Sequence, residues 1–236
     1  MNDRDMDEIL QHAAQTPQPV HPELLDRIAA SLGPSLPAVR PLPPSWVMEG
    51  GLIGIAAAIA IAGAAKFGFF GFLKLSPLYR LIIFPVLAIL IFLAASEWVS
   101  ANIPGSRRRL VPGAAFAVIL LAMLAVFGSL FRDYHTSHFV SAGIVCLEVG
   151  LLHAIPVALL GWLVVRRGFA VNPISAGLVA GTLAALAGVT MLELHCPNFQ
   201  ALHILVWHVA VIPVSAGAGA LLAWVRSGGF RSHSQN

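Results

Sequence analysis

Residues 139–165 read FVSAGIVCLEVGLLHAIPVALLGWLVV, and they are the clearest indication of how this chain folds. They contain one acid, Glu148, and no lysine or arginine, and Arg166 and Arg167 follow directly. A helix of about 20 predominantly apolar residues crosses the hydrocarbon core of a bilayer. Strands of a membrane β-barrel would be shorter, with alternating polarity. The stretch therefore predicts a transmembrane helix.

The composition of the whole chain agrees with this prediction. Of the 236 residues, 58% are apolar and 11% are charged, whereas a soluble domain has roughly 45–50% apolar and about 25% charged residues. Two cysteines are too few for a disulfide framework. The formal net charge of +3, with basic residues in short clusters, argues against direct binding of nucleic acid. We expect an all-α integral membrane protein, with the lipid bilayer as its surroundings.

Apolar runs of similar length recur along the chain, separated by breakers such as Ser76-Pro77 and Asn172-Pro173. The predicted spans are residues 50–72, 78–96, 111–131, 143–165, 174–194 and 203–224. They predict a six-helix transmembrane domain over residues 47–226. A cytoplasmic arm with a proline-rich linker would occupy residues 1–46, and a cytoplasmic tail residues 227–236.

Small residues in these runs predict close contacts between helices. Gly50 and Gly54 form one GxxxG pair, and Gly177 and Gly181 form another. Such pairs let the backbones of transmembrane helices approach each other.

The lysines and arginines predict the orientation, because basic residues concentrate on the cytoplasmic side of membrane proteins. Those at one end of the predicted spans are Arg40, Arg107, Arg108, Arg109, Arg166, Arg167, Arg226 and Arg231; those at the other end are Lys66, Lys74, Arg80 and Arg132. The larger set is expected in the cytoplasm. Both termini would then lie inside, and the protein would be a multi-pass protein of a bacterial inner membrane.

The arm is acidic, since residues 1–46 hold three arginines against six acids, a net charge of −3. Two short helices are expected in it, one over about residues 3–14 and one that begins at Pro22 and ends before Gly33. The apolar stripe of the second helix consists of Leu24, Leu25, Ile28 and Leu32. So short a helix needs a partner, which could be the membrane domain or a basic protein. Anionic lipid would repel the acidic arm.

Counting along the helices from the predicted inner ends places the two cysteines, Cys146 and Cys196, at the same depth on the outer side. The polar residues expected near them are Glu193, His195, His203 and His208. The cysteines could form a disulfide if their Cα atoms lie within about 7 Å. Alternatively, a thiophilic metal ion such as Zn²⁺ or copper could bind there. The candidate metal ligands are Cys146, Cys196, His195, His208 and Glu193. Otherwise these are simply polar residues at a membrane interface.

Catalysis finds no support, because C-x-x-C, G-x-S-x-G and H-E-x-x-H patterns are missing from the sequence. We therefore expect neither an enzyme nor a resident cofactor. An alternative function is a small transporter or metal-handling protein, with Glu148, His153 and Glu193 along a pathway. An acid inside a span is costly, so Glu148 is expected to face the interior of the bundle.

Three sequence features, together with six spans, resemble one known family. A proline-rich stretch, Val39-Arg40-Pro41-Leu42-Pro43-Pro44, precedes the first span. The fifth and sixth spans carry Leu194-His195-Cys196-Pro197, followed by Trp207 and a glycine-rich helix ending at Trp224. In these features the chain is similar, over essentially its whole length, to the NrsF-like family of bacterial membrane anti-sigma factors.

The resemblance implies a regulator that holds an extracytoplasmic-function sigma factor at the membrane and releases it on an envelope signal. Such a protein would act in signal transduction and the stress response. Cysteines on the outer side are implicated in sensing, which points here to Cys146 and Cys196 as a redox sensor. The arm would bind the cytoplasmic sigma factor through the stripe of the second helix. This arm is longer than the short tail typical of the family.

Overall fold

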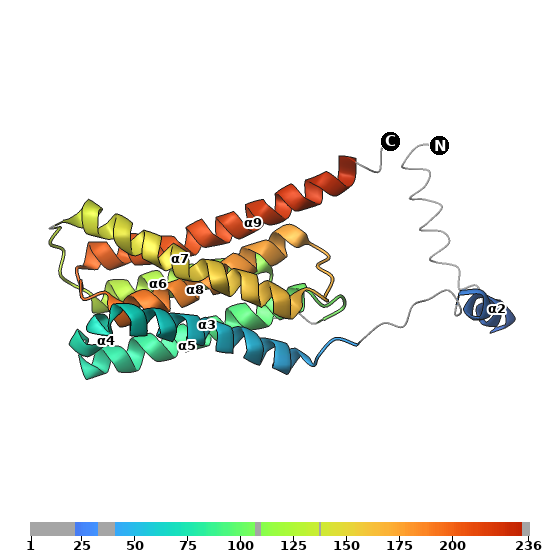
Figure 1. The fold of residues 1–236 in the computed structure, drawn as a ribbon, viewed down its shortest axis with the longest axis horizontal. Coiled ribbons are helices and arrows are strands. Elements are labelled where there is room, and N and C mark those ends of the chain that lie inside the picture. Colours follow the sequence, from blue (N-terminus) through green and yellow to red (C-terminus); the bar gives the residue numbers. More distant parts are fainter. Residues whose placement is uncertain (1–21, 33–40, 107–109, 137, 233–236) are drawn as a thin grey trace. The chain divides into compact units, whose positions relative to one another are not determined.

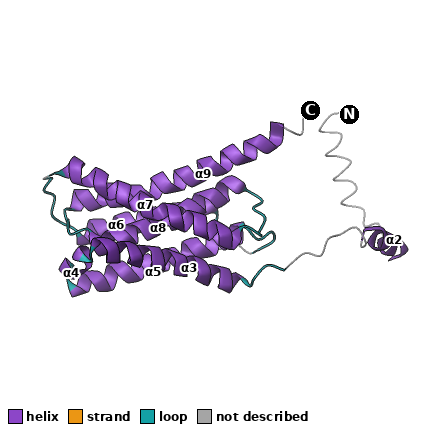
Figure 2. Cartoon of the chain, viewed as in Figure 1, coloured by secondary structure: helices purple, strands orange, loops and turns teal. Residues whose placement is uncertain are grey.

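The computed structural model describes residues 22–32, 41–106, 110–136 and 138–232, and these ranges are helices joined by short connections (Figures 1 and 2). The chain divides into two units, residues 1–41 and residues 42–236. In the first unit the described residues form the helix α2 (Pro22–Leu32). Those of the second unit are α3 (Ser45–Phe67), α4 (Phe70–Lys74), α5 (Pro77–Ala101), α6 (Pro112–Leu130), α7 (Phe139–Val165), α8 (Pro173–His195), the π-helix η2 (His203–His208) and α9 (Val209–Ser232).

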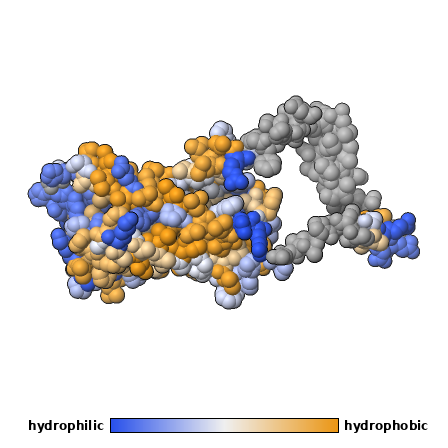
Figure 3. Space-filling model, viewed as in Figure 1, coloured by the Kyte–Doolittle hydropathy of each residue, from blue (hydrophilic) through white to orange (hydrophobic). Residues whose placement is uncertain are grey.

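Six helical segments of the second unit are long and apolar enough to cross a membrane: α3, α5, α6, α7, α8, and η2 continued by α9. Apolar residues cover the middle of the visible face of this bundle, and hydrophilic residues gather at its left end (Figure 3). The protein is thus an all-α integral membrane protein with six transmembrane helices, which confirms the predicted fold class.

Proline and capping residues explain where several of these helices begin. Pro77, Pro112 and Pro173 occupy first-turn positions of α5, α6 and α8, where the missing N–H costs no hydrogen bond. The side chains of Ser76 and Asn172 each accept a hydrogen bond from the backbone N–H three residues further on. These caps satisfy N–H groups that the helix itself leaves unpaired.

The first span differs from the prediction of residues 50–72. It begins at Ser45 and ends at Phe67, because Gly68 has a φ of 102° and stops the helix. The apolar residues after Gly68 form the separate short helix α4. Hydropathy alone does not reveal this break, since both sides of it are equally apolar.

The two ends of the bundle carry different basic residues. The cysteine end consists of the connections 68–76, 131–138 and 196–202; the arm end consists of the start of α3, the connections 102–111 and 166–172, and the end of α9. Lys66, Lys74, Arg80 and Arg132 lie at the cysteine end, and Arg166, Arg167 and Arg226 lie at the arm end. This separation into two sets is as predicted. Arg40, Arg107, Arg108, Arg109 and the side chain of Arg231 lie outside what the structure describes.

Helix α8 lies at the centre of the bundle. In its most apolar part 67% of the residues are buried, against 22–33% in the other five spans. A Cβ on Gly177 would collide with the carbonyl of Gly219, and one on Gly181 with the carbonyl of Ser215. The glycines therefore let α8 and α9 pack backbone against backbone, which confirms the prediction for this GxxxG pair.

The other GxxxG prediction is wrong. Gly50 and Gly54 are exposed, and a Cβ on either would meet nothing within 4 Å. The buried stripe of α3 contains Met48, Leu52 and Ala56 instead. Gly50 and Gly54 follow this stripe by two positions, which places them about 200° around the helix and away from the bundle.

The predicted second helix of the arm is confirmed as α2, with Pro22 at its start. The side chains of Leu24, Leu25 and Ile28 are 52%, 54% and 43% exposed. The side chain of Leu32 and the helix predicted over residues 3–14 lie outside the described residues.

Candidate cysteine and histidine site

Small residues on one face of α7 determine where Cys146 lies. Phe139, Gly143, Cys146 and Gly150 recur at the spacing of a single helix face. A Cβ on Gly143 would collide with the indole ring of Trp207, and one on Gly150 would stand 2.7 Å from a methyl group of Val211. The two glycines thus let α7 approach η2 and α9 closely, and Cys146, between them, faces the interior.

Cys196 reaches the same place from α8, which it follows directly as the C-cap residue. Its side chain is buried, and the next residue, Pro197, cannot continue the helix. Gly71 of α4 packs against the backbone here, since a Cβ on it would stand 2.6 Å from the Cys196 carbonyl oxygen.

The two sulfur atoms lie 3.6 Å apart, with both cysteines free. The structure therefore brings together the two residues that the sequence placed at one depth. The hydrogen bond to Cys146 and burial raise the pKa of the Cys196 thiol, while its contacts with His203 and His208 oppose that shift.

The π-helix η2 brings His203 and His208 to the cysteines. In an α-helix, residues five apart point about 140° away from each other. A π-helix bonds residue i to residue i+5, so residues five apart lie nearly one above the other. The rings of His203 and His208 accordingly meet edge to face, with centroids 5.2 Å apart.

Four side chains converge at this point, and we refer to them as the quartet: Cys146, Cys196, His203 and His208. One candidate ligand atom from each lies within 4.8 Å of the other three. The distance from Cys196 Sγ to His203 Nε2 is 3.7 Å. Cys146 is half-buried, and the other three members are buried. This combination of thiol and imidazole groups suits a soft or borderline metal ion.

Glu193 stands behind the quartet and contacts one of its members. Its Oε1 lies 2.7 Å from Nδ1 of His208, and each side chain is only 1% exposed. Because a carboxylate only accepts hydrogen bonds, Nδ1 of His208 donates to it, and when the ring is neutral its single N–H is the one on Nδ1. Nε2 of His208 is buried and has no hydrogen-bond partner among the described residues.

Two other candidates lie away from the quartet. His195 turns toward α3 and α4: its Nδ1 lies 3.0 Å from the carbonyl oxygen of Gly68, and its ring packs beside Phe67 and Phe70. Glu193, a predicted ligand, occupies a second layer behind His208.

His203, which the sequence placed nearby but not among the candidate ligands, belongs to the quartet. The sequence feature that indicates its place in the quartet is the five-residue spacing between His203 and His208. That spacing places the two rings on one face only in a π-helix.

The residues of the alternative transport pathway are not gathered in one place. Glu148, expected to face the interior of the bundle, is exposed on the surface of α7, so that prediction is wrong. It lies two positions after Cys146, about 200° around the helix from it. His153 packs under Gly63 and against the ring of Phe67, and its Nδ1 lies 2.8 Å from the carbonyl oxygen of Val149.

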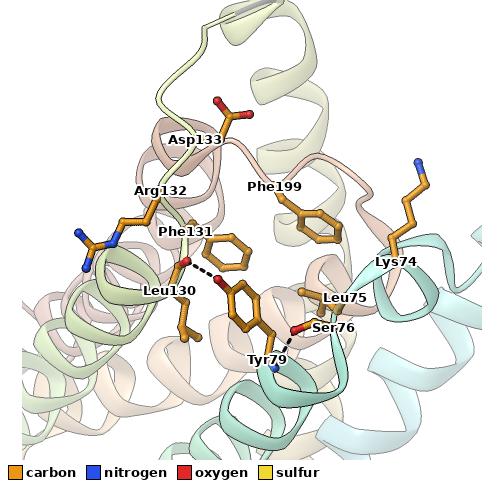
Figure 4. A pocket seen from close by; sticks show the side chains of 9 residues that line it. All are labelled: Lys74, Leu75, Ser76, Tyr79, Leu130, Phe131, Arg132, Asp133 and Phe199. Atoms are coloured by element: carbon orange, nitrogen blue, oxygen red, sulfur yellow. Dashed lines mark hydrogen bonds between the residues drawn. The ribbon is translucent and has the colours of Figure 1, made fainter.

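A separate pocket of about 400 Å³ opens at the cysteine end (Figure 4). Tyr79, Phe131 and Phe199 form its aromatic part, with the hydroxyl of Tyr79 donating to the carbonyl of Leu130. Phe199 comes from the connection between Cys196 and His203. In that connection, Gln200 forms a β-bridge with Asp133, and the N–H of Ala201 donates a hydrogen bond to the backbone carbonyl of Asp133. The quartet itself does not line this pocket.

The comparisons with known proteins point to one family. A family model described as NrsF, negative regulator of sigma F, matches residues 32–226. No curated protein and no solved structure matches the chain. The match contains the whole quartet, the first five spans and the sixth span up to Arg226, and it leaves α2 outside except for Leu32.

Proposed function

The chain belongs to the NrsF family of negative regulators of sigma F, and from that premise we propose that it is a membrane-bound anti-sigma factor. In this proposal it holds an extracytoplasmic-function sigma factor at the cytoplasmic face of a bacterial inner membrane. It releases the sigma factor when the quartet on the outer side changes its redox or metal state. Family membership is the observation that carries the proposal.

The distribution of basic residues supports this orientation. In the sequence, eight lysines and arginines flank the predicted inner ends of the spans, and four flank the outer ends. Because basic residues concentrate on the cytoplasmic side, the arm end faces the cytoplasm and the quartet lies toward the envelope. The bilayer then separates the quartet from the arm.

The exposed stripe of α2 supports the arm as the sigma-binding segment. Leu24, Leu25 and Ile28 present apolar surface on a helix of 11 residues, which is too short to be stable alone in water. The arm is net acidic, so a groove with apolar walls and a basic rim on the partner would match it. Release of the sigma factor would expose this stripe again.

The cysteine pair supports a redox change of state. A two-electron oxidant, such as a peroxide or an oxidised dithiol, would remove two electrons and two protons from the two thiols and leave an S–S bond between Cys146 and Cys196. The 3.6 Å between the sulfurs means that only a small displacement precedes this bond. The new bond would draw α7 toward the end of α8.

Packing in the bundle supplies a route for this displacement. Cys196 and Glu193 lie at one end of α8, and His208 leads directly into α9. Along the rest of their length α8 and α9 contact each other through Gly177 and Gly181. A shift at the quartet would therefore move two closely packed helices together. Coupling to the arm requires two arrangements of these helices whose balance the quartet changes.

The proposal is tested by measuring how much of a candidate sigma factor sediments with membranes that contain the full chain or a variant lacking residues 22–32. We expect retention by the full chain and loss from the deletion variant at equal membrane levels. Equal retention by both would rule out α2 as the binding segment.

A further inference from the structure

We propose that the quartet binds one divalent d¹⁰ metal ion, with Zn²⁺ as the best fit, and that Glu193 positions His208 for it. Binding of the ion follows from the geometry of the quartet. Its meaning as a signal rests on the proposed function.

The distances within the quartet fit a tetrahedral ion. Zinc lies about 2.3 Å from thiolate sulfur and about 2.0–2.1 Å from imidazole nitrogen, so the ligands of a tetrahedral site are roughly 3.3–3.8 Å apart. The distance between the two sulfurs is 3.6 Å, and that from Cys196 Sγ to His203 Nε2 is 3.7 Å. Two edges of the required tetrahedron are thus already formed.

His208 has the tautomer and the free atom that a metal ligand needs. Nδ1 donates its hydrogen bond to Glu193, so in the neutral ring the lone pair is on Nε2 and is available to a metal ion. That Nε2 atom is buried, and no hydrogen-bond partner for it is present in the described part of the chain, although such buried groups are nearly always satisfied. A carboxylate behind a metal-ligating histidine is a recurring second layer of zinc sites.

The charges of the ligands select among metal ions. The two thiolates and the neighbouring Glu193 carboxylate carry three negative charges, so a divalent ion leaves one net negative charge in this largely buried site. A monovalent ion such as Cu⁺ would leave two, which is more costly. Ca²⁺ and Mg²⁺ prefer oxygen ligands in larger number. Four protein ligands also leave no open position for a substrate, as in sites whose ion is structural or regulatory rather than catalytic.

Binding of the ion and oxidation of the cysteines exclude each other. The ion requires both sulfurs as thiolates, whereas a disulfide bond joins the same two atoms to each other. An oxidant that forms the Cys146–Cys196 disulfide therefore expels the ion. One site would in this way respond both to metal supply and to oxidant.

The test uses the full chain purified in detergent under reducing conditions, stripped with a chelator and titrated with Zn²⁺. We expect one equivalent of tightly bound Zn²⁺ per chain. Co²⁺ in its place should give the visible ligand-field bands of a tetrahedral ion and sulfur-to-metal charge transfer. An octahedral Co²⁺ spectrum would overturn the proposal.

Variants distinguish the quartet from its surroundings. Cys196→Ser and His208→Gln should abolish the tight site, and His195→Gln, one residue from Cys196, should retain it. Glu193→Gln keeps the volume of the side chain and should lower the affinity by about 10–100-fold with the stoichiometry unchanged. Tight binding that survives the double change Cys146→Ser and Cys196→Ser, or that is equally lost in a folded His195→Gln variant, would overturn the proposal.

Sedimentation of the sigma factor with the same membranes separates this inference from the proposed function. If the sigma factor is retained and Zn²⁺ does not bind, the inference fails and the proposed function stands. If Zn²⁺ binds and no sigma factor is retained, the proposed function fails and the metal site stands.

Discussion

Glu193 and His208 form a buried pair, with 2.7 Å between Oε1 and Nδ1, at the junction of α8 and η2. Each side chain is 1% exposed. Removing one partner from such a pair leaves a buried polar group without its hydrogen bond, at a cost of about 1–3 kcal/mol. The pair thus links the last turn of α8 to the π-helix and fixes the ring of His208 beside the two cysteines.

Glu193→Leu should therefore destabilise the chain more than Glu193→Gln. The amide oxygen of glutamine can still accept from Nδ1, whereas leucine leaves Nδ1 unpaired at a cost of about 1–3 kcal/mol. The check is the thermal unfolding of the metal-free variants in detergent. Equal unfolding temperatures for the two variants would show that the hydrogen bond does not stabilise this junction. Glu49→Gln, at the arm end, is a control for loss of a carboxylate.

Oxidation should join Cys146 and Cys196 within one chain. They are the only cysteines, and their sulfurs are 3.6 Å apart. After mild oxidant, a maleimide of high mass should label neither cysteine, and reduction should restore two labels per chain. Zn²⁺ added beforehand should slow the reaction.

A linked dimer of chains, or two thiols that stay reactive after oxidation, would contradict the arrangement described here. Cys146→Ser serves as the control, because its remaining cysteine has no partner within the chain.

The close packing of α8 against α9, which we call the seam, predicts different outcomes for two glycine-to-alanine substitutions. Gly181→Ala places a methyl group against the backbone at Ser215 and should cost about 1–3 kcal/mol. Gly54→Ala meets open space and should be neutral or slightly stabilising, because alanine favours helix. Thermal unfolding of both variants provides the measurement, and similar losses in both would argue against the seam.

The apolar stripe of α2 predicts that an acidic substitution within it weakens sigma binding. An acidic substitution on the opposite face of the same helix is the matched control. Leu25→Asp and Ile28→Asp place a charge in the apolar stripe; since burying such a side chain contributes about 1.5–3 kcal/mol, each should weaken binding about tenfold or more. Ala30→Asp adds the same charge on the opposite face and should leave binding unchanged. Binding to the purified sigma factor can be measured by titration. Equal weakening of binding by all three variants would show that the added negative charge, and not the apolar stripe, determines binding.

Orientation can be tested with single cysteines introduced into the Cys146→Ser, Cys196→Ser background. Thr136 lies exposed at the cysteine end and Val171 lies exposed at the arm end. A membrane-impermeant maleimide added to spheroplasts should label Thr136→Cys, and Val171→Cys only after lysis. The reverse pattern would place the quartet on the cytoplasmic side.

Sequence patterns predict the spans and the meeting of the cysteines well, because both depend on counting residues along apolar helices. Cys146 and Cys196 were placed at one depth from the lengths of their helices alone. Likewise, the acidic second helix of the arm follows from its proline start and apolar stripe.

The remaining differences arise where local backbone geometry departs from a uniform α-helix. Gly68 stops α3 within a continuous apolar run, and η2 brings His203 beside His208. Similarly, Gly50 and Gly54 have the same spacing as Gly177 and Gly181, yet only the second pair faces another helix. Which face of a span meets a neighbour depends on the whole bundle and cannot be derived from one helix.

Coupling across the membrane can be measured as the fraction of the sigma factor that stays with the membranes of living cells before and after exposure to a thiol oxidant or a thiophilic metal ion. The wild-type chain should release the sigma factor after at least one of these treatments, and the double variant Cys146→Ser, Cys196→Ser should retain it after both. Release from the double variant to the same extent as from the wild type would contradict the role of the quartet.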